Sequence, residues 1–362
     1  MHPPATHPPA MSASGTQTSG DQPPADGGPV YAAIESGGTK WICALADADG
    51  RILARTRFLT RDPASTLAEA ANWLQAATAA HAGAGAMPAA LGIASFGPLE
   101  LDPTASRYGR LLRTPKPGWS DTDLLAPFRT RFPGMPLALD TDVNAAALAE
   151  AAAFAHHEGR APRSLVYVTV GTGIGGGVVV DGRPLHGLLH PELGHLHPRR
   201  HADDLNQDGA PFAGICPYHG DCLEGLASGP ALQARLGHGL DTAAPDHPVW
   251  AVQADYLGQF CAQIALALSP ERIVLGGGVM QQSVPVQSVP MQSLPVQSLQ
   301  MQSRLLESRL MPLLRARTRH WLGGYLDRAQ TEHGIDQWIV LPACGEDSGL
   351  LGALQLARGA AR

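Results

Sequence analysis

The sequence has 362 residues, of which 44% are hydrophobic and 16% are charged, and this balance is typical of a globular protein with a large buried core. The formal net charge of -6 argues against a broad nucleic-acid-binding surface. No apolar run reaches the roughly 18 residues that a membrane span needs, and five cysteines in no disulfide pattern favour a reducing cytoplasm.

Residues 1–28 are rich in Pro, Gly, Ser and Thr and have neither the basic nor the apolar region of a secretory signal. Such a composition cannot build a core, so we expect a disordered N-terminal tail. Met11 is an alternative start of translation.

Residues 29–46 predict a strand, a tight glycine turn and a second strand. A glycine turn lets backbone N–H groups approach an anion, and a neighbouring carboxylate can hold a magnesium ion. An ordinary hairpin with a solvated lysine explains the same residues. The turn consists of Glu35, Ser36, Gly37, Gly38, Thr39 and Lys40.

Thr66 to Ala82 predicts a helix, and Ala89 to Phe96 predicts a buried strand that ends in Gly97-Pro98. Leu137 to Ala151 then changes from strand to helix. Binding and catalytic groups of α/β proteins gather at such strand ends, where a carboxylate can accept a proton from an attacking hydroxyl. Helix capping is the structural alternative, and one cap would leave another Asp free. The polar residues here are Asp140, Thr141, Asp142 and Asn144.

Leu165 to Val170 predicts a strand, Gly171 to Gly177 a glycine turn and Val178 to Val180 a second strand. This repeats the layout of residues 29–46. Two phosphate-sized hairpins in one chain suggest two similar halves with a nucleotide between them.

Three candidate metal ligands, Cys216, His219 and Cys222, stand at spacings of three. Cysteine and histidine at short spacings favour tetrahedral zinc, and His195 would complete a closed, structural site. The rival fourth ligands are His190, His197 and His201, and two buried thiols near exposed histidines are the alternative without a metal. Glu224 comes so soon after Cys222 that the metal loop would fix its position.

Helices are predicted for Leu226–Leu236, Trp250–Leu268, residues 304–320 and Leu350–Arg358, and strands for Glu271–Val279 and Gln337–Leu341. The first of these strands ends in Gly276, Gly277 and Gly278, which would let part of a nucleotide lie against the backbone, although a plain turn explains them equally well. Residues 279–303 repeat with a period of five, and we interpret 284–303 as a low-complexity insertion.

From about residue 30 onward the sequence resembles the ROK family of sugar kinases, and among them the bacterial fructokinase type. Five motifs in the same order carry the resemblance: Glu-Ser-Gly-Gly-Thr-Lys, Leu-Asp-Thr-Asp-Val-Asn-Ala-Ala, Thr-Val-Gly-Thr-Gly-Ile-Gly-Gly-Gly, His-Pro-Glu-Leu-Gly-His and Cys-Pro-Tyr-His-Gly-Asp-Cys-Leu-Glu-Gly-Leu-Ala-Ser-Gly-Pro.

The resemblance implies an actin-like ATPase (ribonuclease H-like) fold, with two α/β domains and an interdomain cleft. The N-terminal domain would span residues 29–143, with a C-terminal helix at about 348–362 packing back on it. The C-terminal domain would span 144–347 and contain the zinc loop 195–222 and the insertion 284–303. Family members are often dimers, so a homodimer is expected.

The resemblance also implies transfer of the ATP γ-phosphate to a sugar hydroxyl, with Asp142 as the general base and with Mg²⁺ and a structural Zn²⁺. Sugar contacts would come from Gly97, Thr141, Asp142, Glu192, His195 and Glu224. Phosphate and nucleotide contacts would come from Gly37, Gly38, Thr39, Lys40, Gly171, Thr172, Gly173 and Gly276–Gly278. The zinc ligands would be His195, Cys216, His219 and Cys222.

Two details place the resemblance in the fructokinase subgroup: Glu35 where many members have Asp, and Cys-x2-His-x2-Cys where glucokinases and repressors have Cys-x-Cys-Gly-x2-Gly-Cys. The expected substrate is therefore fructose, and a mannose or glucose kinase is the main alternative. A sugar-sensing regulator is a weaker one, because the N-terminal tail is too short and too Pro-rich for a helix-turn-helix. A non-catalytic zinc protein would leave both glycine turns unexplained.

Overall fold

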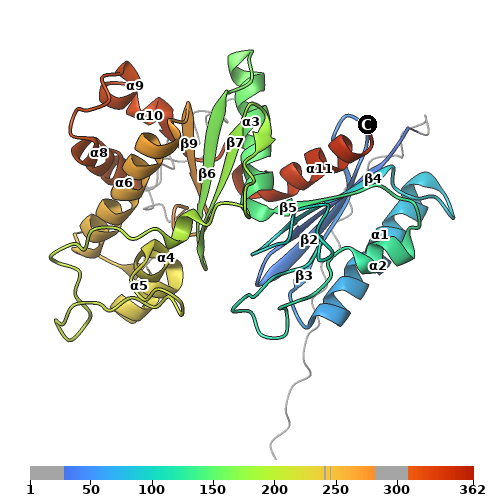
Figure 1. Cartoon of the computed structure of the whole chain (residues 1–362), viewed down its shortest axis with the longest axis horizontal. Coiled ribbons are helices and arrows are strands. Elements are labelled where there is room, and N and C mark those ends of the chain that lie inside the picture. The colour runs from blue at the N-terminus through green and yellow to red at the C-terminus, as the bar shows by residue number, and fades with distance from the viewer. Residues whose placement is uncertain (1–27, 240–241, 245, 282–308) are drawn as a thin grey trace, which may run out of the picture.

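Two five-stranded mixed sheets, each covered by helices on both faces, make up the residues that the computed structural model describes, which are 28–239, 242–244, 246–281 and 309–362 (Figure 1). The predicted insertion 284–303 and, except for residue 28, the predicted disordered tail lie outside these residues. Within them no helix is both long and apolar enough to cross a membrane.

The first sheet has the strand order β3-β2-β1-β4-β5. Its first three strands form an antiparallel meander, and β4 and β5 continue the sheet in parallel beside β1. The strands are β1 (Tyr31–Ser36), β2 (Lys40–Ala46), β3 (Ile52–Leu59), β4 (Ala90–Ser95) and β5 (Leu137–Thr141). Helices α1 (Pro63–Ala82) and α2 (Ala126–Arg131) connect them, and α3 (Asp142–Glu158) comes next.

The second sheet repeats this topology, with the order β10-β9-β6-β7-β8. Its strands are β6 (Ser164–Val170), β7 (Ile174–Val180), β8 (Arg183–Pro184), β9 (Arg272–Gly276) and β10 (Ile339–Val340). Its helices are α4 (Leu223–Ala227), α5 (Gly229–Leu236), α6 (Val249–Leu268), α8 (Leu310–Leu322), α9 (Ala329–Glu332), α10 (Ile335–Trp338) and α11 (Ser348–Ala360), with short 3-10 helices η1 (Leu193–His195) and η4 (Gly345–Asp347). We call residues 31–158 the first half and 164–360 the second half.

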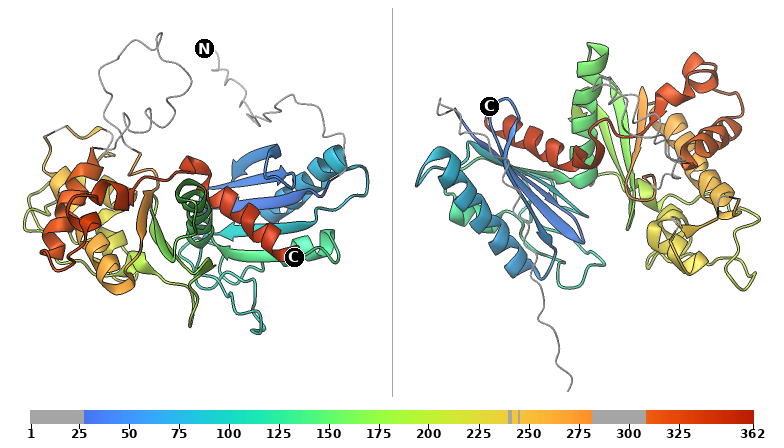
Figure 2. Two further views of the ribbon diagram at one scale, coloured as in Figure 1. Left: turned by 90° about the horizontal axis from the view of Figure 1, so that it is seen from above. Right: turned by 180° about the vertical axis from the view of Figure 1, so that it is seen from behind.

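The last helix of each half packs on the sheet of the other half. Helix α3 covers β6 and β7, where Val143, Ala147 and Phe154 join a buried cluster with Tyr167 and Val179. Helix α11 covers β1, β2 and β4, where its leucines are buried against alanines of those strands. The two helices lie side by side between the sheets (Figure 2). The predicted domain boundary at residue 143 stays a prediction.

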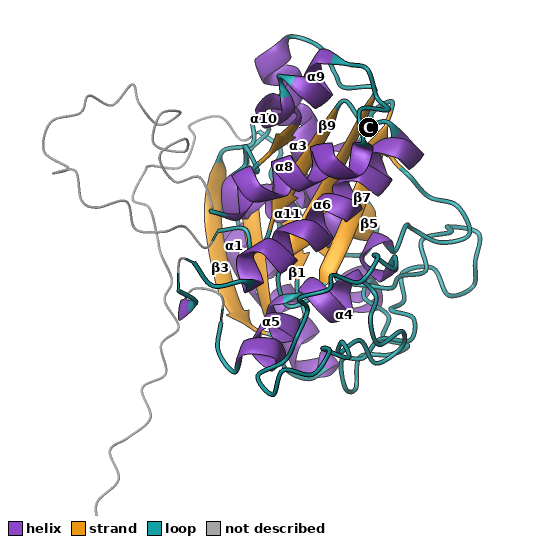
Figure 3. Ribbon diagram, turned by 90° about the vertical axis from the view of Figure 1, so that its left-hand side faces the viewer, coloured by secondary structure: helices purple, strands orange, loops and turns teal. Residues whose placement is uncertain are grey.

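The outer faces carry the larger cores. On the first sheet, α1 packs its leucines against Trp41 and the strands around it. On the second sheet, α6 and α8 bury Tyr256, Phe260 and Leu314 against β6 and β9, and Figure 3 shows both helices in front of the strands. Burial of this much apolar surface is the main favourable term in folding. Helices α3 and α11 cover the inner faces of the two sheets, and these two helices contact each other at the centre of the molecule.

Three glycines let these central elements approach more closely than any side chain allows. A Cβ atom added to Gly92 would lie 1.9 Å from the Ala353 carbonyl oxygen. One added to Gly177 would lie 2.0 Å from the Val143 carbonyl oxygen, and one added to Gly352 would lie 1.8 Å from the Ala145 carbonyl oxygen. Gly177 explains a difference from expectation. The predicted glycine turn 171–177 is wrong in extent, because residues 174–177 belong to β7 and serve this close packing rather than a turn.

Other predicted elements also differ from the structure. The single helix Leu226–Leu236 is wrong, because Ser228 separates α4 from α5 and its hydroxyl caps α5 by accepting from the Ala231 N–H. The strand Gln337–Leu341 is wrong in extent, since α10 takes residues up to Trp338 and β10 keeps two residues. The sequence pattern predicts no strand for Ile52–Leu59, where β3 forms the edge of the first sheet.

Candidate active site and metal centre

The carboxyl end of β5 turns directly into α3, and Asp142 is the first residue of that helix. Thr141 caps the helix, since its Oγ1 accepts a hydrogen bond from the Asn144 N–H at 3.1 Å. The Asp142 Oδ1 accepts from the Val143 N–H at 2.9 Å. The sequence is compatible with several caps, and the structure assigns the cap to Thr141. Asp142 therefore stands at a helix N-terminus, which favours a negative charge.

Asp140, two residues earlier, has a structural task. Its Oδ1 accepts from the Thr141 N–H at 2.7 Å and from the Asn144 side-chain amide at 2.8 Å. Its Oδ2 lies 3.0 Å from Nε2 of His186, which comes from the segment after β8. This hydrogen bond to Asp140 raises the pKa of His186. Of the two aspartates at the strand end, Asp140 is thus occupied by protein groups, and Asp142 is the one that can serve a ligand.

Three carboxyl groups around this point have raised pKa values. Burial is the first cause for Asp142, whose pKa rises to about 7 with a further contribution from the charge of Glu192. Burial and then the charge of Asp142 raise the pKa of Glu35 to about 7. Burial and the charge of Glu224 raise the pKa of Glu192 to about 7. Carboxyl groups gathered with pKa values near neutrality are typical of a site that transfers protons.

Glu35 has a feature that protein contacts leave unexplained. Its Oε2 is buried and has no hydrogen-bond partner among the described residues. A Cβ atom at Gly349, at the start of α11, would lie 2.8 Å from the Glu35 carboxyl group, so the glycine makes room for this side chain. A buried carboxylate oxygen without a donor is costly unless it neutralises or binds a cation or water. Mg²⁺ takes carboxylate oxygen ligands, so Glu35 can supply one ligand to such an ion.

Both glycine turns are built from backbone hydrogen bonds. In the β1–β2 turn the Gly37 N–H donates to the Lys40 carbonyl at 2.9 Å, and the Thr60 hydroxyl donates to the Gly37 carbonyl at 2.7 Å. Gly38 and Thr39 are exposed at its tip, and Lys40 begins β2. The charge of Lys40 lowers the pKa of the Glu35 carboxyl group against the larger effect of burial. The turn thus presents open backbone with a lysine beside it.

In the β6–β7 turn the Gly171 N–H donates to the Gly173 carbonyl at 2.9 Å, and Thr172 is exposed at the tip. Gly229, at the start of α5, donates its N–H to the Gly171 carbonyl at 2.8 Å. Ile174, the first residue after the turn, donates its N–H to Oε2 of Glu224 at 2.9 Å. The turn is therefore fixed by the segment that contains the metal ligands.

The three-glycine loop after β9 joins the same place. A Cβ atom at Gly171 would lie 3.9 Å from the Gly278 N, and one at Gly277, where φ is +90°, would lie 2.4 Å from the Val170 carbonyl oxygen. Gly276 ends β9, where a Cβ atom would meet the Tyr167 hydroxyl oxygen at 2.4 Å. Close packing requires glycine at Gly276, and close packing together with a positive φ requires it at Gly277. The loop therefore lies against the β6–β7 turn.

Glu192 and Gly97 approach each other from different halves. A Cβ atom at Gly97 would lie 3.3 Å from the His190 ring, and Nδ1 of that ring lies 3.4 Å from Oε1 of Glu192. The Gly97–Pro98 peptide bond is cis. Among the residues predicted to contact a sugar, Asp142 and Glu192 interact through their charges, and Glu224 acts on the pKa of Glu192 in the same way. Gly97 is connected to Glu192 through the His190 ring.

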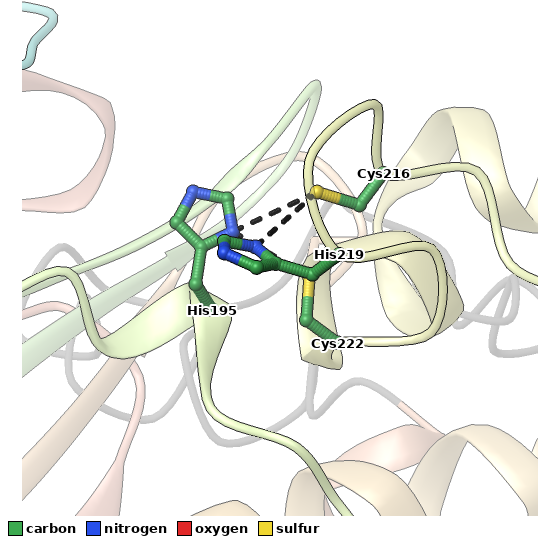
Figure 4. A group of neighbouring side chains, drawn as sticks. All are labelled: His195, Cys216, His219 and Cys222. Atoms are coloured by element: carbon green, nitrogen blue, oxygen red, sulfur yellow. Dashed lines mark hydrogen bonds between the residues drawn. The ribbon is translucent and has the colours of Figure 1, made fainter.

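A metal-ligand cluster forms beside Glu224 from His195, Cys216, His219 and Cys222, with one ligand atom from each residue and all four within 4.8 Å of one another (Figure 4). His195 lies in η1, Cys216 and His219 lie in a loop, and Cys222 immediately precedes α4. That loop closes on itself, since the Gly220 N–H donates to the Cys216 carbonyl at 2.9 Å. The rival ligands His190, His197 and His201 are not part of the cluster.

Three of the spacings between the ligand atoms match the edges of a tetrahedral zinc site. Nδ1 of His195 lies 3.5 Å from the Cys222 sulfur and 3.8 Å from the Cys216 sulfur, and Nδ1 of His219 lies 3.7 Å from the Cys216 sulfur. Zinc bonds of 2.0–2.3 Å give a tetrahedron with edges of about 3.3–3.8 Å. The residues present therefore fit Zn²⁺ with four protein ligands, the pattern of a structural site.

Sequence reasoning missed two polar groups that hold the site together. Glu150 of α3 accepts hydrogen bonds from the Ala343 and Cys344 N–H groups at 2.8 and 3.0 Å and from the Ser348 hydroxyl at 2.8 Å. The second group is the His186 ring, which contacts Asp140. The available signals were an acidic residue within an alanine-rich helix and a histidine shortly after β8. Neither signal indicates its partner.

Comparison with known proteins agrees with this arrangement. The model of the ROK family matches residues 31–297. The chain is 41% identical over 330 residues to a fructokinase of Zymomonas mobilis and 39% identical over 328 residues to a putative fructokinase of Bacillus subtilis. Each alignment covers 91% of this chain, and 96% and 95% of the relative. The crystal structure of a ROK hexokinase from Thermus thermophilus is 26% identical with a TM-score of 0.62, covering 91% of this chain and 98% of that one.

Proposed function

The chain belongs to the ROK family, and on that premise we propose that it is an ATP-dependent hexose kinase whose substrate is fructose, phosphorylated at the 6-hydroxyl. Membership confirms the expected actin-like ATPase fold, with two α/β halves of the same topology. The observation that carries the proposal is the position of Asp142, at a helix N-terminus and close enough to Glu35 of the first half and Glu192 of the second for their charges to interact.

Asp142 would act as the general base. Its carboxylate keeps one oxygen on the Val143 N–H, which leaves the other to accept the proton of the attacking hydroxyl. A pKa of about 7 suits a base that must be ionised before the reaction and protonated after it. Phosphoryl transfer needs little covalent chemistry from a protein, so positioning and charge neutralisation supply the remainder.

The nucleotide would lie along the two glycine turns. Gly37, Gly38 and Thr39 with Lys40 would bind phosphate oxygens from the first half, and Gly171, Thr172 and Gly173 from the second. Gly276, Gly277 and Gly278 would line the adenosine. Mg²⁺, held by Glu35 directly or through water, would neutralise phosphate charge. Glu35 supports this assignment with its unpartnered buried oxygen.

The sugar would be held by residues from both halves. Gly97, Thr141 and Asp142 come from the first, and Glu192, His195 and Glu224 from the second. A structural Zn²⁺ on His195, Cys216, His219 and Cys222 would fix the loop that carries these acidic side chains. Using Nδ1 of His195 for the metal leaves its Nε2 for a sugar hydroxyl.

The substrate assignment is tested by ATP-dependent phosphorylation of fructose, mannose, glucose, N-acetylglucosamine and N-acetylmannosamine by the zinc-loaded protein with Mg²⁺. A kcat/KM that is highest for fructose would support the proposal. Preference for mannose or glucose would keep the kinase and change its substrate, and no turnover on any sugar would favour a regulator.

The proposal includes two further expectations, on the oligomeric state and on the cellular compartment. A homodimer is expected, and light scattering of the purified chain at several concentrations would test it. All five cysteines are free, as a reducing cytoplasm would keep them, and a Cys2His2 centre needs its two thiols unoxidised.

A further inference from the structure

His190 connects the two halves beside the proposed sugar site, and the proposed reaction gives it no role. It belongs to the segment between β8 and η1 of the second half, and its side chain is only 4% exposed. Its Nε2 accepts a hydrogen bond from the Leu99 N–H of the first half at 3.1 Å. The ring also packs on Gly97, where a Cβ atom would lie 3.3 Å from Cε1. The buried His190 ring therefore forms a specific contact between the two halves.

The hydrogen bond to Leu99 fixes which ring nitrogen carries the proton. A backbone N–H can only donate, so Nε2 is unprotonated and the neutral ring carries its hydrogen on Nδ1. Burial lowers the pKa of His190, which keeps the ring neutral. Nδ1 lies 3.4 Å from Oε1 of Glu192, and the ring also hydrogen-bonds the Pro191 backbone, which offers only a carbonyl oxygen. Nδ1, the donor end of the ring, therefore lies beside both the Pro191 carbonyl and Oε1 of Glu192.

Glu192 needs such a neighbour. Its side chain is 46% exposed, and the charge of Glu224 also acts on it. A long, half-exposed side chain has several rotamers, and selecting one of them costs entropy. A carboxylate that binds a sugar hydroxyl must be held within about 0.5 Å of its productive position. A buried ring nitrogen 3.4 Å from one carboxylate oxygen can make that selection.

The segment is anchored at a second point. His186, four residues earlier, lies 3.0 Å from the Asp140 carboxylate at the end of β5, whereas Leu99 comes after β4. Strands β4 and β5 are neighbours in the first sheet. The segment that leads to Glu192 is therefore attached to the first sheet at two adjacent strand ends, and His190 is the anchor next to Glu192.

We propose that His190 is a positioning residue: its ring, held by the Leu99 amide, orients the Glu192 carboxylate toward the sugar and fixes it relative to the Gly97–Leu99 turn of the other half. The part that concerns the sugar rests on the proposed function. The pairing of His190 with Glu192 does not.

Two substitutions separate the two ends of the ring in the full-length, zinc-loaded protein. His190→Gln can place an amide oxygen near the position of Nε2 and keep the Leu99 contact, while it loses the donor to Glu192. His190→Asn can place an amide N–H near the position of Nδ1 and loses Leu99. Because both ends are needed, each variant should lose about 10- to 100-fold in kcat/KM for fructose, with the KM for ATP nearly unchanged.

A double-mutant cycle distinguishes orientation from general support of the fold. If His190 acts through Glu192, the variant with both His190→Gln and Glu192→Gln should be no worse than Glu192→Gln alone. Additive losses, or a wild-type kcat/KM in His190→Gln, would overturn the proposal. His81→Gln is the matched control, since His81 is a partly buried histidine on α1 that bonds only within its own helix among the described residues.

A spectroscopic measurement needs no turnover. In protein labelled with ¹⁵N-histidine, the His190 signals, assigned through His190→Gln, should show a protonated Nδ1 and an unprotonated Nε2, and Glu192→Gln should shift the Nδ1 resonance. The opposite tautomer, or no shift, would overturn the pairing. A wild type that phosphorylates none of the five sugars would instead remove the proposed function and leave this measurement to decide on His190.

Discussion

The two halves of the molecule share a strand order and differ in the length of chain after the third strand. In the first half, β3 ends at Leu59 and α1 begins at Pro63. In the second half, β8 ends at Pro184 and α6 begins only at Val249. The long segment between them contains both proposed sugar-binding glutamates and the four proposed metal ligands. We call the strand topology that both halves share the frame, and the residues between β8 and α6 the added segment. The frame contains the two glycine turns and Asp142. The added segment contains the side chains proposed to select the sugar.

This division makes a first prediction about the frame. Asp142→Asn should lower kcat by about 10²- to 10⁴-fold, the usual contribution of a general base, because the amide cannot accept the hydroxyl proton. Fructose binding, measured by calorimetry, should stay within a few-fold of wild type. Asp49→Asn, an exposed aspartate in the β2–β3 turn, is the control. Near-normal turnover of Asp142→Asn would end the assignment of the base.

The second prediction concerns the added segment. Cys216→Ser should remove the bound zinc, measured by elemental analysis, and lower kcat/KM for fructose by about 10- to 100-fold, because the loop carrying Glu224 loses its support. The KM for ATP should change little. Cys344→Ser, which alters a cysteine outside the cluster, should keep its zinc. Full activity without zinc would show that the segment is held by other contacts.

The third prediction tests the crossing of α3 and α11, which joins the halves. Gly352→Ala should lower the free energy of unfolding by about 1–3 kcal/mol, since its Cβ would overlap the Ala145 carbonyl oxygen. Gly359→Ala, in the same helix with open space around it, should raise stability by up to about 1 kcal/mol. Urea unfolding measures both. If both variants changed the free energy of unfolding equally, the close packing of α3 on α11 would not contribute to stability.

The smallest expected effect is a shift in pH dependence. The base must be ionised, so kcat/KM should fall as the pH decreases through about 7, the pKa of Asp142. The charge of Glu192 contributes to that raised pKa, so Glu192→Gln should move the acid limb to lower pH in its residual activity. Glu332→Gln, an exposed glutamate on α9, should leave the limb in place. If the acid limb of Glu192→Gln stays in place, the charge of Glu192 does not affect the pKa of Asp142.

Much of the frame could be predicted because each of its elements has a local signal. Apolar runs predict β1, β2, β4 and β6, and glycines mark the turns between them. Strand β3 was missed because it is an edge strand, in which polar residues such as Arg55 and Arg57 interrupt the apolar ones. The glycines of β7 resemble a turn in sequence, because no local pattern indicates that Val143 packs on Gly177.

The site was predictable in its parts and not in its connections. The metal ligands stand close in sequence, and the structure groups the predicted set. The contact of His190 with Leu99 joins residues 91 positions apart, and that of Glu150 with Ser348 joins residues 198 apart. Such pairs depend on how the two halves face each other, for which the sequence has no local pattern.

The exchange of terminal helices has a consequence for how the chain is made. The inner face of the first sheet is covered by α11, and Arg55 of β3 is paired with Asp347, 292 residues later. At roughly 5–20 residues per second, a ribosome needs about 15–60 s to cover that stretch. Until then Ala33, Ile42 and Ala44 form an apolar face without its cover. The nascent first half is therefore a natural client for chaperones, and its folding is completed only when α11 emerges.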